Sequence, residues 1–122
     1  MTSARQQLGA AGEQAAEALL SRAGCVVLTR NYRWEGGEAD LVALDARTVV
    51  FIEVKTRRGE AYGTPFEAVT RAKRLRVSRT ALHYLARHGL FGRDVRFDVI
   101  GVWRDGAGLR CEWIRDAFEG IE

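Results

Sequence analysis

Three charged residues, Asp40, Glu53 and Lys55, stand beside two apolar runs in a pattern that could bind a metal ion. Asp40 comes directly before the run at 41–44, whereas Glu53 lies near the end of the run at 49–54 and Lys55 directly follows it. Carboxylate oxygens are the ligands that Mg²⁺ and Mn²⁺ prefer. If the two runs are neighbouring strands, Asp40 and Glu53 could share one divalent cation.

The spacing of the two runs predicts a β-hairpin that would bring these residues together. Four residues, 45–48, separate the runs, which is a typical hairpin distance. In a register in which opposed residue numbers sum to 93, Asp40 faces Glu53 and Glu38 faces Lys55. Opposed residues have Cβ atoms roughly 4.5–5.5 Å apart. A slip of one residue would undo both facing pairs.

An exposed row of ion pairs is the alternative interpretation of this hairpin, and such rows stabilise proteins little. Both faces of the two runs are nevertheless apolar except at the charged end, which is typical of a strand buried on both sides. Charges at the end of a buried hairpin need partners or a metal ion. The pattern therefore favours a functional site over a solvated surface.

The remaining elements follow from periodicity and from Gly breaks. Apolar residues at helical spacing predict a helix over 3–23 and a second helix that begins near Pro65 or Thr70 and ends at His88. The second helix should bury the stripe Leu75, Ser78, Leu82 and Leu85. Strands are predicted over 25–32, 95–103 and 109–114, and an exposed loop over 56–64. The order predicts an α/β fold with a central mixed β-sheet flanked by helices.

Composition limits the class of protein. The chain has 122 residues, 47% of them hydrophobic, which suits a single domain over 1–122 with its own core. The sequence has neither a long apolar run nor a signal-like N-terminus, so we expect a cytoplasmic protein without a membrane segment. Cys25 and Cys111 lie among apolar neighbours and are expected to be buried thiols.

Positive charge is concentrated in the middle of the chain. Residues 54–96 contain eleven basic and three acidic residues, whereas the rest of the chain carries a net charge of −5. Such segregation suits a polyanion, although a solvated helix face is the common alternative. The residues expected to contact nucleic acid are Arg57, Arg58, Arg71, Lys73, Arg74, Arg76 and Arg79.

The charged hairpin resembles the signature of the PD-(D/E)XK nucleases. The segments that carry the resemblance are Gly36-Gly37-Glu38-Ala39-Asp40 and Glu53-Val54-Lys55. More narrowly, the chain resembles the YraN-like uncharacterised bacterial family, which is similar to archaeal Holliday-junction resolvases. This narrower likeness also includes Gly12-Glu13, Asn31-Tyr32 and Arg96-Phe97-Asp98-Val99. Ala39 stands where the signature has proline, a residue that supplies no ligand.

The resemblance implies a restriction-endonuclease-like core and a set of catalytic roles. Asp40 and Glu53 would hold Mg²⁺ or Mn²⁺, with the Val54 carbonyl as a further ligand. Lys55 would orient the attacking water or stabilise the charged phosphorane. Glu13 corresponds to the helical acid of the resolvase-like proteins and would be a further metal ligand, and Glu38 would be a partner of Lys55.

Two classes of function are consistent with these observations. The first is a metal-dependent endonuclease that hydrolyses phosphodiester bonds in nucleic acid, with DNA, including branched DNA, as the expected substrate. The second is a catalytically silent nucleic-acid-binding or scaffold protein of the same fold. A resolvase-like homodimer would present two basic helices to a branched substrate.

Overall fold

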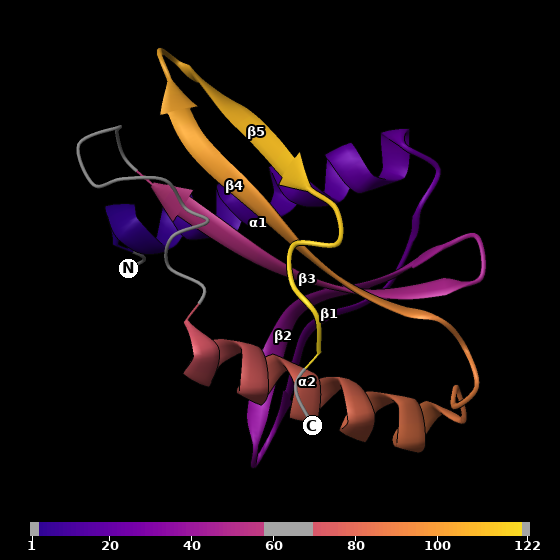
Figure 1. Ribbon diagram of the computed structural model, residues 1–122. Coiled ribbons are helices and arrows are strands. Elements are labelled where there is room, and N and C mark those ends of the chain that lie inside the picture. The colour runs from indigo at the N-terminus through magenta and orange to yellow at the C-terminus, as the bar shows by residue number, and fades with distance from the viewer. Residues whose placement is uncertain (1–2, 58–69, 121–122) are drawn as a thin grey trace.

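The protein is described here by a computed structural model that covers residues 3–57 and 70–120 (Figure 1). Within these residues the chain forms two helices and five strands in the predicted order. They are α1 (Ala4–Arg22), β1 (Val26–Trp34), β2 (Gly37–Asp45), β3 (Thr48–Arg57), α2 (Arg71–His88), β4 (Val95–Asp105) and β5 (Gly108–Ile114). The predicted loop at 56–64 is corrected at its start, because Thr56 and Arg57 continue β3, and the rest of it lies outside the described residues.

The strands form one mixed sheet in the order β1-β2-β3-β4-β5. β3 and β4 are parallel, and the other neighbouring pairs are antiparallel. A parallel pair needs a long crossover connection, and α2 lies in the connection between β3 and β4. The predicted α/β fold with a central mixed sheet and two flanking helices is confirmed.

The helix ends have the capping residues that the sequence predicts. Ser3 caps α1, and its hydroxyl accepts the Gln6 N–H while the Gln6 side chain accepts the Ser3 N–H. Thr70 caps α2 by accepting the N–H of Lys73 at 3.2 Å. Gly89 ends α2 in the left-handed region, with φ of 66°. The second of the two predicted starts of this helix, Thr70, is therefore the one observed.

Each face of the sheet packs against one helix. On one face, Val42, Phe51 and Val99 pack with residues of α2, including Tyr84. On the other face, Leu41, Ile52 and Ile100 pack with Ala16 and Leu20 of α1. Figure 1 shows the sheet passing between the two helices. Because side chains alternate along a strand, Glu53 and Lys55 share the α2 face with Phe51.

The buried stripe of α2 differs from the predicted one. The buried residues of this helix are Val77, Ser78, Thr80, Ala81, Tyr84 and Leu85. Leu82, predicted to be buried, has 53% of its surface exposed. The reason is that Tyr84 anchors the helix, since its ring makes edge contacts with Tyr32 and Phe51 at centroid distances of 4.9 and 5.7 Å. This anchor turns the leucine away from the sheet.

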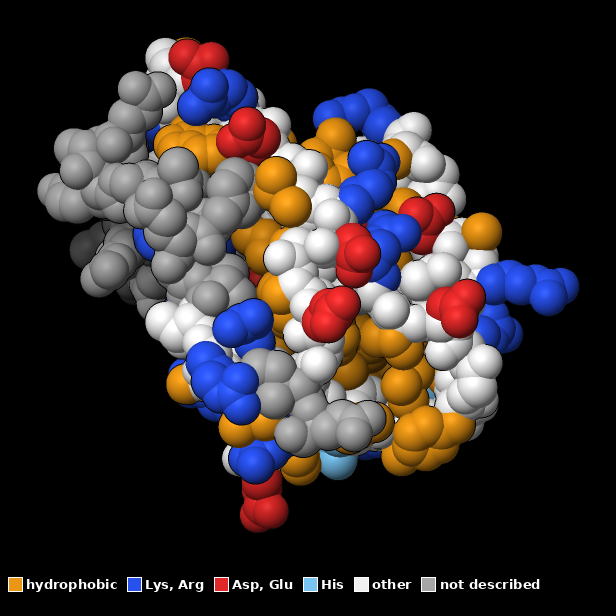
Figure 2. Space-filling model, viewed as in Figure 1, with side chains coloured by type: hydrophobic (Ala, Val, Ile, Leu, Met, Phe, Trp, Pro, Cys, Tyr) orange, Lys and Arg blue, Asp and Glu red, His pale blue; other side chains and the backbone are white. Residues whose placement is uncertain are grey.

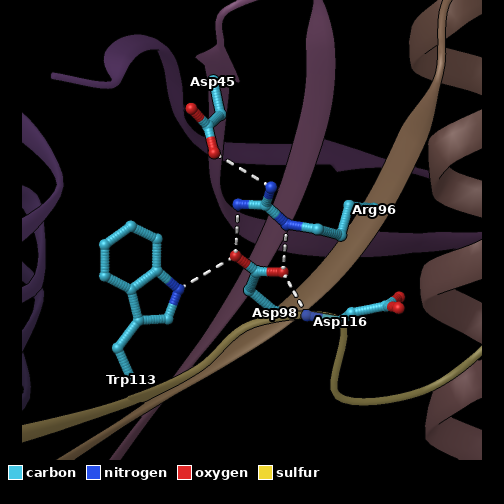
Figure 3. A network of polar contacts seen from close by, with 5 residues as sticks. All are labelled: Asp45, Arg96, Asp98, Trp113 and Asp116. Atoms are coloured by element: carbon cyan, nitrogen blue, oxygen red, sulfur yellow. Dashed lines mark hydrogen bonds and ion pairs between the residues drawn. The ribbon is translucent and has the colours of Figure 1, made fainter. Parts of the chain in front are cut away.

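A buried polar network fixes the C-terminal part of the sheet (Figure 3). Asp98 of β4 is fully buried. Its Oδ1 accepts hydrogen bonds from Arg96 Nε and the Asp116 N–H, and its Oδ2 accepts from Arg96 Nη2 and Trp113 Nε1, all at 2.9–3.0 Å. Arg96 also pairs with Asp45 at 2.9 Å. Because both oxygens of Asp98 are satisfied, this carboxylate holds the fold together rather than binding a ligand.

The cysteines and helices bear on the predicted class of protein. Cys25 is buried, Cys111 is half-buried, and both are free thiols next to the apolar cluster on the α1 face. Both cysteines are thus free thiols, as predicted, but the predicted burial is confirmed for Cys25 and only partial for Cys111. Neither described helix is long and apolar enough to cross a membrane.

Candidate functional site

The candidate site lies where β2 and β3 stop pairing with each other. The observed register has Leu44 opposite Val49 and Leu41 opposite Ile52, so opposed numbers sum to 93 as predicted. The ladder ends at the second pair, and the Val54 N–H instead donates a hydrogen bond to Asp40 Oδ2 at 2.8 Å. Asp40 and Glu53, which were predicted to face each other, therefore lie just past the last paired residues of β2 and β3. At this point the side chain of Asp40, rather than a backbone carbonyl of β2, accepts the hydrogen bond from β3.

Glu38 has an observed partner on the side of β2 that faces β1, whereas the predicted facing of Glu38 and Lys55 lies beyond the end of the β2–β3 ladder. It is opposite Arg33 in the β1–β2 ladder, and its Oε2 lies 3.5 Å from Arg33 Nε. Both side chains are mainly exposed, so this pair contributes little to stability. Glu38 nevertheless lines the same cleft as Lys55, which leaves it at the edge of the site.

The carboxyl groups of Asp40 and Glu53 lie together at this point. Burial, followed by the hydrogen bond and the negative charge of Asp40, raises the pKa of Glu53 to about 9. Burial and the adjacent Asp40 therefore favour the protonated form of Glu53 at neutral pH, because two adjacent carboxylates resist being ionised together. A divalent cation can replace that proton and neutralise both charges. The pair thus has the chemistry of a metal-binding centre.

Glu13 reaches the same place from α1. Burial, and next the Asp40 carboxyl, raise the pKa of Glu13, whereas a hydrogen bond from Asn31 opposes that shift. The preceding residue, Gly12, is buried against Thr56 of β3, and a Cβ atom there would collide with the threonine side chain. The glycine therefore allows α1 to lie close to β3, and Glu13 is near enough to Asp40 for that carboxyl to raise its pKa.

Two lysines face the carboxylates. Lys55 is half-buried at the end of β3, and Lys73 is half-buried in the first turn of α2. Lys73 lies on the buried stripe of α2, one turn before Val77. The adjacent amino group of Lys55, and then burial, lower the pKa of Lys73. The sequence placed Lys73 only among the residues that contact nucleic acid, whereas the structure brings it to the centre of the site.

These residues surround a cleft of about 480 Å³. One wall is the hairpin of β1 and β2, the floor is the end of β3, and the opposite wall is the first half of α2. The lining residues are Arg33, Trp34, Glu35, Gly37, Glu38, Asp40, Glu53, Val54, Lys55, Lys73, Arg76 and Val77.

Trp34 fixes the hairpin wall of this cleft to α2. Its indole stacks on the His83 ring at a centroid distance of 4.3 Å, and its Nε1 donates to Thr80 Oγ1 at 2.8 Å. Gly36 lies against the indole, since a Cβ atom there would overlap it. Trp34 thus has a packing role, and it keeps the wall in place.

The predicted nucleic-acid contacts fall into groups. Lys73 and Arg76 line the cleft, and Arg71, Arg76 and Arg79 are exposed on α2. Figure 2 shows basic side chains gathered over the N-terminal end of this helix. Arg57 and Arg74 are half-buried, and within the described residues their Nε atoms are buried without a hydrogen-bond partner. Arg58 lies outside the described residues.

The donor set fits a hard divalent cation. In residues 3–57 and 70–120 no group of three or more His, Cys, Asp and Glu side chains is arranged to hold a metal. Mg²⁺, however, is commonly held by one or two carboxylates and keeps several water ligands. Asp40 and Glu53 meet that requirement, and Asp40 lies close enough to Glu13 to raise the pKa of that third acid. The Val54 carbonyl stays a predicted ligand.

The fold and the cleft define an α/β protein with a mixed sheet and a carboxylate–lysine site at the end of one strand pair. Residues 12–102 match the uncharacterised protein family UPF0102, and the chain belongs to that family. A UPF0102 protein of Moorella thermoacetica is 50% identical over 86% of this chain and 88% of its own length. The UPF0102 protein STH1475 of Symbiobacterium thermophilum is 50% identical over 93% of this chain and 97% of its own length. The predicted membership of the YraN-like family is therefore confirmed.

Proposed function

We propose that this protein is a Mg²⁺- or Mn²⁺-dependent nuclease that hydrolyses phosphodiester bonds in nucleic acid. The observation that carries the proposal is the adjacent carboxyl pair Asp40 and Glu53, which lies in one cleft with two lysines. A pair of acids beside a pair of bases suits a cation and a phosphate bound side by side. The mixed sheet with a site where two strands separate is also consistent with a restriction-endonuclease-like core of the PD-(D/E)XK type.

Each residue has a distinct role in this proposal. Asp40 and Glu53 hold the metal ion, which supplies an activated water molecule and neutralises charge on the phosphate. Lys55 orients the attacking water or stabilises the negative charge that develops on the non-bridging phosphate oxygens. Glu13 supports the metal from α1, and Glu38 remains at the rim, where its charge affects entry to the cleft.

DNA is the proposed substrate, and branched DNA is the form most worth testing. The exposed arginines of α2 flank the cleft and offer contacts to successive phosphates. Backbone contacts of this kind are insensitive to base sequence, so the substrate would be selected by shape. A homodimer acting in the cytoplasm would offer two such clefts to one branched molecule.

A cleavage screen tests the proposal. Duplex, flap, single-stranded and four-way-junction DNA, with RNA in parallel, are incubated with Mg²⁺ or Mn²⁺, and products are resolved on denaturing gels. Cleavage should require the metal and should be lost in Asp40→Asn and Glu53→Gln. Glu112→Gln, which changes an exposed acid on β5, should cleave like the wild type.

Two other outcomes would contradict the proposal in different ways. Equal cleavage by Asp40→Asn and the wild type would mean that the activity comes from elsewhere. Tight binding of DNA without cleavage of any substrate would instead favour the alternative function, a nucleic-acid-binding or scaffold protein. The basic side chains over α2 are the observation that keeps this alternative open.

A further inference from the structure

The choice of basic residue at the site differs from that in the rest of the chain. Lys and Arg together number 19, yet only two of them, Lys55 and Lys73, are lysines. These two are 18 positions apart in the sequence, on different elements, and they meet in one cleft. Arginine is a broad planar fork, whereas lysine is a compact point charge on a flexible stem. The cleft thus contains both lysines of the chain, and Arg33 and Arg76 also line it.

Lys73 is also placed differently from the other basic residues of α2. It lies on the stripe that packs on the sheet and is half-buried, whereas Arg71, Arg76 and Arg79 are exposed. Lys73 and Lys55 line the same cleft, together with Glu53 and Arg76. The charges of Lys55 and Arg57 both lower the pKa of Lys73, whereas the Glu53 carboxyl raises it.

Two amino groups held together in this way repel each other whenever both are protonated. Neither can accept a hydrogen bond while it is charged, so the pair needs an acceptor between its members. An anion with several oxygens satisfies both, because each ammonium can donate to a different oxygen. The adjacent carboxylate pair would neutralise a cation in the same cleft, which leaves the phosphate oxygens of a substrate as the acceptors for the lysines.

We propose that Lys73 is a second substrate-binding cation of the active site, which together with Lys55 holds the non-bridging oxygens of the phosphodiester group at the metal. This inference rests on the proposed function and adds α2 to the active centre. It also identifies the substrate group that the cleft recognises as a single phosphodiester anion. The binding does not require turnover, so it can be measured without metal.

Lysine NMR provides a direct test, because the whole chain has two lysine side chains to observe. Protein with ¹³C-labelled lysine is titrated with a short single-stranded oligodeoxynucleotide in the presence of EDTA, and Lys73→Arg assigns the two Cε signals. Both signals should shift, with saturation at the same concentration as fluorescence anisotropy shows for the labelled oligonucleotide.

Substitutions separate a binding role from a packing role. Lys73→Met keeps most of the volume and removes the charge, and it should weaken oligonucleotide binding by about tenfold, the value of one charge-assisted hydrogen bond. Lys73→Arg should recover most of that loss. Arg87→Gln, which removes an exposed charge from the far end of α2, should change affinity by less than about twofold.

Each remaining outcome identifies what fails. A shift of the Lys55 signal without a shift of the Lys73 signal, or wild-type affinity in a folded Lys73→Met, would overturn the role of Lys73 and leave the proposed function intact. No shift of either signal at saturation would remove both lysines from the substrate site. Calorimetry with Mn²⁺ reports on the carboxylates separately, so absent metal binding would overturn the proposed function while the phosphate result stands.

Discussion

The Val54 N–H donates a hydrogen bond to the Asp40 carboxylate at 2.8 Å, at the point where the β2–β3 ladder has ended. Asp40 therefore has two tasks, since it closes the backbone of β3 and supplies an oxygen to the candidate metal site. A strand edge that opened further would leave the Val54 N–H without a partner. The two tasks can be separated by substitution.

The first prediction uses the oxygen that asparagine retains. Asp40→Asn should keep a carbonyl oxygen for the Val54 N–H and lose less than about 0.5 kcal/mol of stability, whereas Asp40→Ala should lose about 1–2 kcal/mol. Both variants should lose Mn²⁺ binding in calorimetric titrations, because both lack the charge. Lys55→Ala should bind Mn²⁺ within a few fold of the wild type. Retained Mn²⁺ affinity in Asp40→Asn/Glu53→Gln would place the metal elsewhere.

The second prediction follows from the pKa of Glu53, which burial and Asp40 raise to about 9 from 4.5. The folded protein holds a proton that the unfolded chain releases above pH 4.5, so stability is lost as pH rises from about 4.5 towards 9. Glu53→Gln keeps a donor to Asp40 and removes this titration. In EDTA it should raise the free energy of unfolding by about 2 kcal/mol at pH 8 and leave it unchanged near pH 4.5.

Urea denaturation at several pH values measures this difference. Glu38→Gln is the matched control, because that carboxylate is on the same strand as Asp40 but 62% exposed. It should change stability by only a few tenths of a kcal/mol at any pH. If the gain in stability of Glu53→Gln did not depend on pH, the pKa of Glu53 would not differ between the folded and the unfolded state, and the prediction would be wrong.

The third prediction concerns Asp98. Asp98→Ala would leave Arg96 with Asp45 alone and would leave the Trp113 Nε1 and the Asp116 N–H without their acceptor, so it should destabilise the protein by about 3–5 kcal/mol. Asp116→Asn is the control, because Asp116 contributes its backbone N–H to the network and asparagine tolerates its φ of 53°. Denaturation in urea measures both. A loss below about 1 kcal/mol in Asp98→Ala would mean that the network contributes specificity rather than stability.

Local patterns were sufficient to predict the elements and the register. Alternation and turn residues located the hairpin of β2 and β3, and the sum of 93 followed from the length of its turn. The pattern could not predict where the ladder would end. That point depends on the Asp40 side chain taking the Val54 N–H, which is a choice between a backbone and a side-chain acceptor.

Tertiary placement explains what the sequence did not reveal. The stripe of α2 was assigned from leucines, whereas the helix is held by Tyr84 and by small residues that fit against the sheet. Lys73 lies on the observed stripe, one turn before Val77. Because the stripe was assigned to the wrong residues, Lys73 was not predicted to be part of the site. The sequence did contain one indication that Lys73 belongs to the site. Of the 19 basic residues only Lys55 and Lys73 are lysines, and Lys55 was already a predicted site residue.

The last prediction tests α2 as the contact surface for nucleic acid. If its exposed arginines neutralise phosphates, log affinity should fall with log salt concentration by roughly 0.9 for each duplex phosphate contacted. Arg76→Glu/Arg79→Glu should therefore reduce that slope by the equivalent of about two contacts and weaken binding to all sequences alike.

The control makes the same change of charge away from the cleft. Arg87→Glu/Arg93→Glu alters two exposed arginines, one at the end of α2 and one in the loop that follows it. Fluorescence anisotropy with a labelled duplex and a labelled four-way junction, at several salt concentrations, gives the slopes. If both double variants lower the slope equally, net charge alone attracts the DNA. If neither does, the basic side chains of α2 are a solvated face, and the nucleic acid must reach the cleft by another surface.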